Sequence, residues 1–200
     1  MRGTLIRTTV TSRTDKVDDH VWSFLNAASA DGRKIIGLDT EWKLVLDSDS
    51  GFDSEVKSKS NLAILVLCDG NSCLIIQMPY LDSVPTSLFT FLRLPNITFV
   101  GVGIKENMAK FEKEYGIGCK NAVELGPLAA AVMMMPRPSA CGVDRLALEV
   151  NGIFLHDQRP ISTIFNDWGA KVLSKKHAKL AAINAYAYYR IGNKLSNGME

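Results

Sequence analysis

Residues Lys34–Trp42 read KIIGLDTEW, and this stretch decides the fold. The apolar run Ile35–Leu38 follows an Asp31-Gly32 turn signal and is rich in β-branched residues, so it predicts a buried β-strand. Because side chains alternate along a strand, Asp39 and Glu41 project from the same face. Two neighbouring carboxylates repel each other, and Mg²⁺ is often bound through one or two such groups. The pair therefore indicates a divalent-metal site, although a D-x-E triplet alone is also typical of the solvated end of an ordinary strand.

The composition is that of a globular domain. The chain has 200 residues, of which 46% are hydrophobic, and this suits a single α/β domain over residues 1–200. A net charge of +2 is too small to indicate nucleic-acid binding by itself. No signal peptide or apolar run of ~18 residues is present, so we expect a nuclear or cytoplasmic protein that does not enter a membrane. The cysteines lack metal-ligand spacing, and we expect reduced core residues at Cys68, Cys73, Cys119 and Cys141.

Hydrophobic periodicity predicts a chain in which strands and helices mix. The first helix should bury a stripe made of Val17, Val21, Trp22, Leu25 and Ala28. A Ser- and Asp-rich surface loop is expected at Lys43–Asn61, followed by a hairpin around Asp69-Gly70-Asn71. The strands are expected at Gly3–Thr11, Lys34–Trp42, Leu62–Cys68, Ser72–Met78, Ile97–Ile104 and briefly within Ala122–Met135; the helices at Asp15–Ala28, Ser83–Leu92, Lys105–Tyr115, the rest of Ala122–Met135, Val143–Val150 and Ser174–Leu195. This order fits a ribonuclease H-like α/β fold, with a mixed central sheet whose first three strands are antiparallel and which is flanked by helices.

Four sequence blocks resemble one known family. They are IIGLDTEW, NLAILVLCDGNSCLIIQM, FVGVGIKENMAKFEKEYGI with NAVELGPLA, and a tryptophan followed after four residues by LSKKHAKLAAINAYAYYRIGNKL. In this order they resemble the exonuclease domain of the Werner syndrome type, in the tyrosine-containing branch of the DEDD 3′-5′ exonucleases. The resemblance covers Ile35–Leu195. It implies the ribonuclease H-like fold and hydrolysis of phosphodiester bonds by two metal ions.

The resemblance also implies a set of site residues. In the family, four carboxylates hold two divalent ions, and a tyrosine four residues before the last carboxylate positions the attacking water. The first carboxylate pair falls on Asp39 and Glu41. The second motif's aspartate position holds Asn107, and the third motif's tyrosine and aspartate positions hold Leu180 and Asn184. Because positions i and i+4 share one helix face, the last two changes point into the same site.

These replacements predict a degenerate metal site. An asparagine offers a neutral amide oxygen, so only two carboxylates remain to offset the charge of two divalent ions. Glu106 does not restore the second position, since one residue of offset turns a helical side chain about 100° away. We therefore expect at most one weakly held Mg²⁺ or Mn²⁺ ion at Asp39 and Glu41, or none.

A basic run precedes and opens the last helix. Phosphate contacts are expected from this run and from Trp42, which follows the first carboxylate pair, although a basic run is equally typical of an ordinary solvated helix face. The basic residues are Lys171, Lys175, Lys176 and Lys179.

Three functions remain open from the sequence. The first is a degenerate exonuclease-domain protein that binds nucleic acid, DNA or RNA, or a protein partner with little or no nuclease activity. The second is an impaired but active metal-dependent 3′-5′ exonuclease, and the third is a pure protein-interaction scaffold. Metal-dependent cleavage separates the second from the other two, and salt-dependent binding separates the first from the third.

Overall fold

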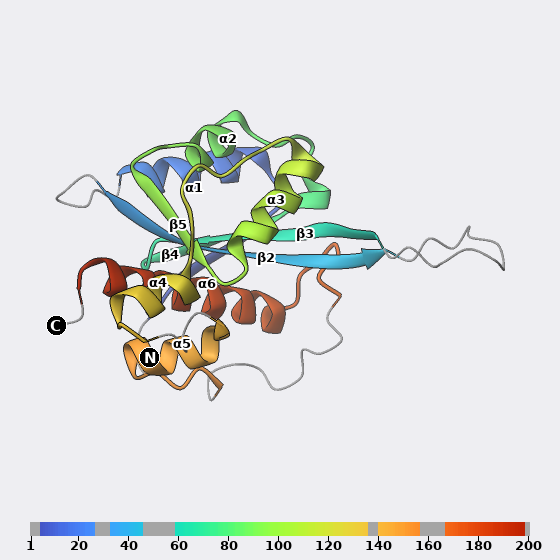
Figure 1. Ribbon diagram of the computed structural model, residues 1–200. Coiled ribbons are helices and arrows are strands. Elements are labelled where there is room, and N and C mark those ends of the chain that lie inside the picture. The colour runs from blue at the N-terminus through green and yellow to red at the C-terminus, as the bar shows by residue number, and fades with distance from the viewer. Residues whose placement is uncertain (1–4, 27–32, 46–58, 136–139, 157–166, 199–200) are drawn as a thin grey trace, which may run out of the picture.

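A mixed six-stranded sheet forms the centre of the molecule (Figure 1). The computed structural model describes residues 5–26, 33–45, 59–135, 140–156 and 167–198. Within them the strands lie in the order β1-β4-β3-β2-β5-β6. Their bounds are Arg7–Thr11 (β1), Lys34–Val45 (β2), Lys59–Cys68 (β3), Ser72–Gln77 (β4), Ile97–Gly101 (β5) and Ala122–Glu124 (β6).

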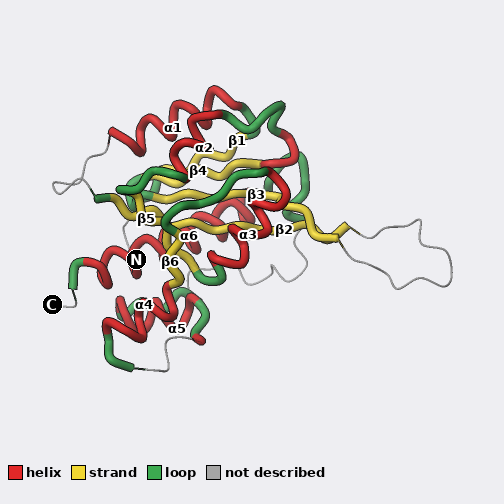
Figure 2. Tube along the Cα trace, turned by 45° about the horizontal axis from the view of Figure 1, so that its top comes forward, coloured by secondary structure: helices red, strands yellow, loops and turns green. Residues whose placement is uncertain are grey.

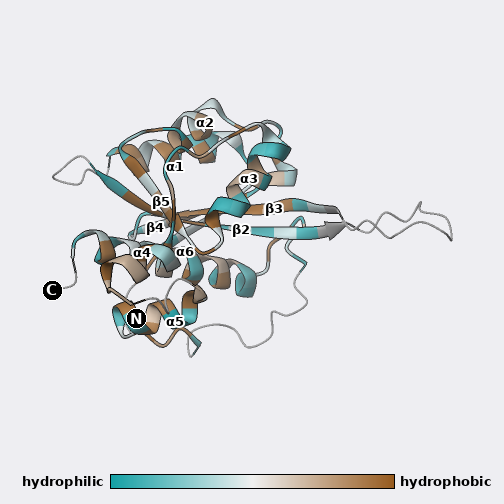
Figure 3. Cartoon of the chain, viewed as in Figure 1, coloured by the Kyte–Doolittle hydropathy of each residue, from teal (hydrophilic) through white to brown (hydrophobic). Residues whose placement is uncertain are grey.

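Helices cover both faces of this sheet, as the tube view shows (Figure 2). One face carries α1 (Thr14–Asn26), α2 (Thr86–Leu92) and α3 (Ile104–Tyr115), and a 3₁₀ turn, η1 (Met78–Tyr80), follows β4. The other face carries α4 (Leu125–Val132), α5 (Val143–Asn151) and the long α6 (Lys175–Ser196). Apolar residues gather in the strands between the two helical layers (Figure 3). Burial of these residues on both faces explains why β3 and β4 are nearly continuous apolar runs.

The predicted antiparallel strands are present, but they are the second to fourth strands of the chain. β2 pairs antiparallel with β3, and β3 pairs antiparallel with β4. The opening strand β1 instead pairs parallel with β4, from Arg7 opposite Ser72 to Thr11 opposite Ile76. The expectation that the first three strands form the antiparallel set was therefore wrong when the count begins at β1. β5 and β6 extend the sheet in parallel from β2.

Two further sequence predictions need correction. Helix α1 buries Val17, Val21 and Phe24, whereas Trp22 is 67% exposed. A core-facing stripe advances by three or four residues, and Phe24 continues it from Val21 where Trp22 does not. The surface loop predicted at Lys43–Asn61 is also too long, because β2 continues to Val45 and β3 begins at Lys59; residues 46–58 lie outside the described ranges.

Two other expectations concerned reduced cysteines and the absence of a membrane-spanning segment. Cys68 and Cys73 are buried directly opposite each other on β3 and β4, and all four cysteines are free thiols. Among the described residues, no helix combines the length and the apolar character needed to cross a bilayer.

Candidate functional site

Asp39 and Glu41 face the side of the sheet that α6 covers. In the antiparallel register, Asp39 lies opposite Val66 and Glu41 lies opposite Ile64. Directly opposed residues project from the same face, and Val66 and Ile64 both belong to the buried cluster that packs against α6. The carboxylates therefore share that face, as the period-2 argument predicted.

The two carboxylates have different environments. Asp39 is only 7% exposed, and its Oδ1 accepts a hydrogen bond of 3.0 Å from the backbone N–H of Thr40. Glu41 is half-buried. Burial, and then the nearby charge of Asp39, raise the pKa of Glu41 to about 8. In the absence of a cation, the pair therefore holds a proton at neutral pH.

Helix α6 packs closely against β2 beside this pair. A β-carbon built on Gly37 would lie 1.9 Å from the backbone oxygen of Ala185, so only glycine allows this approach. The contact places Ala185, the residue after Asn184, against Gly37, which precedes Asp39 by two residues on β2. Asn184 itself is half-buried.

Leu180 is a core residue of the α6 face. It is 8% exposed and belongs to the same buried cluster as Ile64 and Val66, the strand neighbours of Glu41 and Asp39. An apolar side chain thus fills a position where the resemblance implies a tyrosine hydroxyl. A leucine has no group that could orient a water molecule.

Asn107 lies in the first turn of α3 and is half-buried. Strand β5 leads to it, and a β-carbon on Gly101 would lie 2.6 Å from the backbone oxygen of Leu38, the residue before Asp39. Gly103 then turns the chain with a left-handed φ of 69°. The carboxylate of Glu124 accepts a 2.6 Å hydrogen bond from the N–H of Gly103 and so fixes the start of α3. Sequence reasoning missed this role of Glu124, whose only signal was its place at the end of the short predicted strand.

Glu106 precedes Asn107 in the first turn of α3 and is exposed. Its carboxylate forms a 2.9 Å salt bridge with Lys110, and its side chain is 75% exposed. The hydrogen bond to Lys110 also lowers the pKa of Glu106. Glu106 therefore remains an ordinary surface residue. Whether Asn107 and Asn184 meet the carboxylate pair in one site remains a prediction.

Hydrogen bonds hold the segment before α6 against the face of the sheet that carries Asp39 and Glu41. Gln77 on β4 lies opposite Ile64, which lies opposite Glu41, so the three residues form a row across neighbouring strands about 10 Å long. The Nε2 of Gln77 donates to the backbone oxygens of Ala170 and Lys171 at 3.0 and 3.2 Å.

Two further contacts hold this segment. The hydroxyl of Tyr80 donates to the backbone oxygen of Gly169 at 2.5 Å, and the side chain of Ser174 caps α6 by accepting from the N–H of His177 at 3.2 Å. Sequence reasoning missed Gln77 and Tyr80 because their partners lie about ninety residues away in the chain. The four predicted basic residues, Lys171, Lys175, Lys176 and Lys179, are all exposed along this tethered segment and the first turns of α6.

Trp42 lies on the opposite face of β2. A register shift between Glu41 and Trp42 places Trp42 opposite Leu62, and its ring packs against the cluster that α1, α2 and α3 cover. Its Nε1 donates to Thr40 at 3.2 Å, and the Nζ of Lys110 lies 5.8 Å from the ring centroid. The structure therefore separates Trp42 from the carboxylate face, and its predicted phosphate contact remains a prediction.

The residues present do not fit a two-ion centre. Within the described ranges, no group of three or more His, Cys, Asp or Glu side chains could hold a metal. Of the predicted site residues, Asp39 and Glu41 supply anionic oxygens on the α6 face, whereas Asn107 and Asn184 carry neutral amides. A divalent ion held by one or two carboxylates usually needs waters and substrate phosphates to complete its shell.

Comparison with solved structures defines the class of fold. The Escherichia coli RNase D, an exoribonuclease involved in structured RNA processing, superposes with a TM-score of 0.75 at 20% identity. The match covers 96% of this chain and 45% of RNase D, so this chain spans about half the length of that protein. The Nibbler EXO domain of Aedes aegypti gives a TM-score of 0.72 at 13% identity, covering 98% of this chain and 90% of that one. Brucella melitensis NrnC with bound Mg²⁺ gives 0.65 at 16% identity, covering 97% and 81%. The fold is thus the ribonuclease H-like α/β fold of exonucleases.

The sequence itself identifies the family. The family model for 3′-5′ exonuclease matches residues 23–200, so the chain belongs to the 3′-5′ exonuclease family within the DEDD superfamily. A curated relative, the RISC-interacting clearing 3′-5′ exoribonuclease 1 of Arabidopsis thaliana, is 26% identical over 181 residues, covering 90% of this chain and 80% of that protein.

Proposed function

We propose that this 3′-5′ exonuclease-domain protein binds single-stranded RNA in its former catalytic groove and hydrolyses it little or not at all. The observation that carries the proposal is Leu180, which is buried with the strand neighbours of the carboxylate pair instead of offering a hydroxyl.

The charge at the site supports the same conclusion. Two-ion hydrolysis requires enough anionic ligands to hold both ions about 4 Å apart. With Asn107 and Asn184 in place of aspartates, each lost charge weakens the attraction for a nearby divalent ion by several kcal/mol before solvation offsets part of it, for an effective dielectric constant of about 20. Asp39 and Glu41 then bind at most one Mg²⁺ or Mn²⁺ ion weakly.

Phosphate binding rests on the basic segment before and at the start of α6. The contacts of Gln77 and Tyr80 fix the backbone of this segment on the face that carries Glu41. Exposed lysines on a fixed backbone can neutralise phosphates and release counterions. RNA is favoured over DNA because two matched proteins are named as exoribonucleases, and a further neighbour, NrnC, is described as bound to pGG.

The test is salt-dependent binding of a labelled single-stranded RNA, followed by fluorescence anisotropy. The variant Lys175→Gln/Lys176→Gln/Lys179→Gln should weaken binding by about tenfold or more and reduce the slope of log K against log salt by about 2, because each single-strand phosphate contact contributes roughly 0.7. The matched control, Lys16→Gln/Lys113→Gln/Lys120→Gln, removes the same charge from other exposed positions and should change the slope little.

Two outcomes would redirect the proposal. If the wild-type protein does not bind RNA at low salt, the scaffold function replaces it, and the partner is a protein. If the wild-type protein shortens the RNA from its 3′ end and Asp39→Ala abolishes this, the chain is an impaired enzyme.

A further inference from the structure

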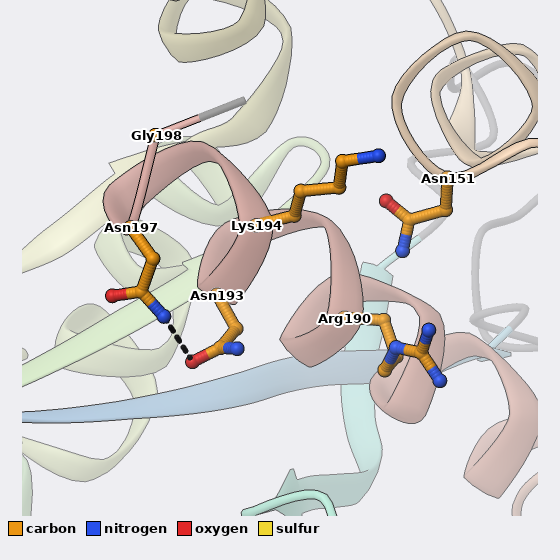
Figure 4. A pocket seen from close by; sticks show the side chains of 6 residues that line it. All are labelled: Asn151, Arg190, Asn193, Lys194, Asn197 and Gly198. Atoms are coloured by element: carbon orange, nitrogen blue, oxygen red, sulfur yellow. Dashed lines mark hydrogen bonds between the residues drawn. The ribbon is translucent and has the colours of Figure 1, made fainter. Parts of the chain in front are cut away.

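A polar cavity of about 340 Å³ lies at the C-terminal end of α6, where α5 packs against it (Figure 4). The described residues of its lining supply two cationic side chains, three amide side chains and no acidic one. The residues are Asn151 of α5 and Arg190, Asn193, Lys194, Asn197 and Gly198 at or beyond the end of α6. This lining differs from the apolar surfaces that join α6 to the sheet.

Arg190 and Lys194 have no acidic partner among the described residues. Arg190 and Lys194 lie four residues apart, so their like charges share one helix face and repel. Among the described residues neither takes part in a salt bridge. Arg190 donates to the Tyr186 hydroxyl at 3.2 Å and lies 5.9 Å from the centroid of that ring, and these contacts orient the guanidinium without adding a negative charge. The helix dipole favours Lys194 in the last turn, but its effect does not extend back to Arg190.

The amides provide complementary hydrogen-bonding groups. The Nδ2 of Asn197 donates to the Oδ1 of Asn193 at 3.4 Å, which leaves the amide nitrogen of Asn193 to donate elsewhere. Figure 4 shows that this nitrogen lies on the side of Asn193 facing Arg190. The Oδ1 of Asn151 is buried and has no hydrogen-bond partner in the described part of the chain. An anionic ligand that accepts hydrogen bonds would satisfy the two cations and the amide nitrogen of Asn193.

We propose that this cavity is a second binding site, which takes a nucleotide with its phosphate between Arg190 and Lys194 and with the amide nitrogen of Asn193 donating to it. A guanidinium and an ammonium are the side chains best suited to phosphate oxygens. The cavity volume lies near the lower end of the roughly 300–1,000 Å³ typical of small-molecule sites. Arg190 and Lys194 follow Asn184 by about 9 and 15 Å along the helix axis, so the site is distinct from the carboxylate pair.

The phosphate can come from a free mononucleotide or from one unit of a bound strand. Calorimetric titration at low ionic strength with adenosine monophosphate and with inorganic phosphate tests the first source. Titration with a short single-stranded RNA tests the second. Arg190→Gln/Lys194→Gln should weaken binding of adenosine monophosphate by about tenfold or more, since charge-assisted hydrogen bonds are lost. The control Lys175→Gln/Lys176→Gln removes the same charge at the other end of α6 and should change it less than about threefold.

A third variant tests whether weaker binding can be obtained without loss of the folded structure. Asn197→Asp changes an exposed lining residue, keeps the size of the side chain and adds a negative charge, so it should weaken phosphate binding while the thermal unfolding midpoint stays close to that of the wild type. Asp39→Asn should leave this binding unchanged, which separates the cavity from the proposed groove. The proposal is overturned if adenosine monophosphate binding does not depend on Arg190 and Lys194, or if the two double variants lose adenosine monophosphate binding equally.

Discussion

The backbone oxygen of Ala185 lies directly against Gly37, at 1.9 Å from where a β-carbon would stand. This contact fixes how close α6 comes to the strand that carries Asp39. Gly37→Ala should therefore push the helix away and destabilise the protein by about 1–3 kcal/mol, since backbone atoms cannot yield as a flexible side chain can. Urea unfolding measures the change.

Gly142→Ala is the matched control for Gly37→Ala. No atom of the described residues lies within 4 Å of its β-carbon position, and its φ of −72° suits alanine. A cost below about 1 kcal/mol is expected there. Equal costs at the two glycines would show that α6 is not packed as described.

Residue types and spacing were sufficient to predict the strands β2 to β5 and the long α6, and to predict that Asp39 and Glu41 project from the same face of β2. Burial on one or both sides of an element leaves a local hydrophobic pattern in the sequence. The parallel pairing of β1 with β4 leaves no such pattern, since Arg7 and Ser72 are far apart in the chain. The contacts of Gln77 and Glu124 were missed for the same reason. Trp22 was misplaced because apolar character alone does not distinguish it from Phe24, which has the right helical phase.

His20 on α1 makes stability depend on pH. Burial lowers its pKa, with a partial opposing effect from Asp19, and its ring centroid lies 6.2 Å from that of Phe24. Between the lowered pKa and about 6.5, the unfolded chain binds more protons at this residue than the folded one, so stability rises with pH across that window. Acidification from about pH 7 to pH 5.5 should therefore destabilise wild type more than His20→Gln, as measured by thermal unfolding. Identical losses in both proteins would contradict the role of His20.

Metal binding should be weak and limited to one ion. Titration calorimetry with Mg²⁺ or Mn²⁺ should show at most one low-affinity site, because two carboxylates cannot hold two divalent ions. Asp39→Asn/Glu41→Gln should remove the signal that remains. Two tight sites in the wild-type protein would mean that ligands other than this pair complete the centre.

We propose that the three replacements at Asn107, Leu180 and Asn184 are sufficient to remove exonuclease activity from this site. The most direct measurement is nucleotide release from the 3′ end of single-stranded RNA in Mg²⁺ or Mn²⁺ by the variant Asn107→Asp/Leu180→Tyr/Asn184→Asp. Single aspartate changes should do little, since residues that act as a unit are strongly non-additive. The unfolding midpoint of each variant confirms that it is folded. We predict that the triple variant releases nucleotides, that adding Asp39→Ala to it stops the release, and that the wild-type protein shows none above background. Robust release by the wild-type protein that is abolished by Asp39→Ala, or a folded triple variant that remains inactive, would contradict the account.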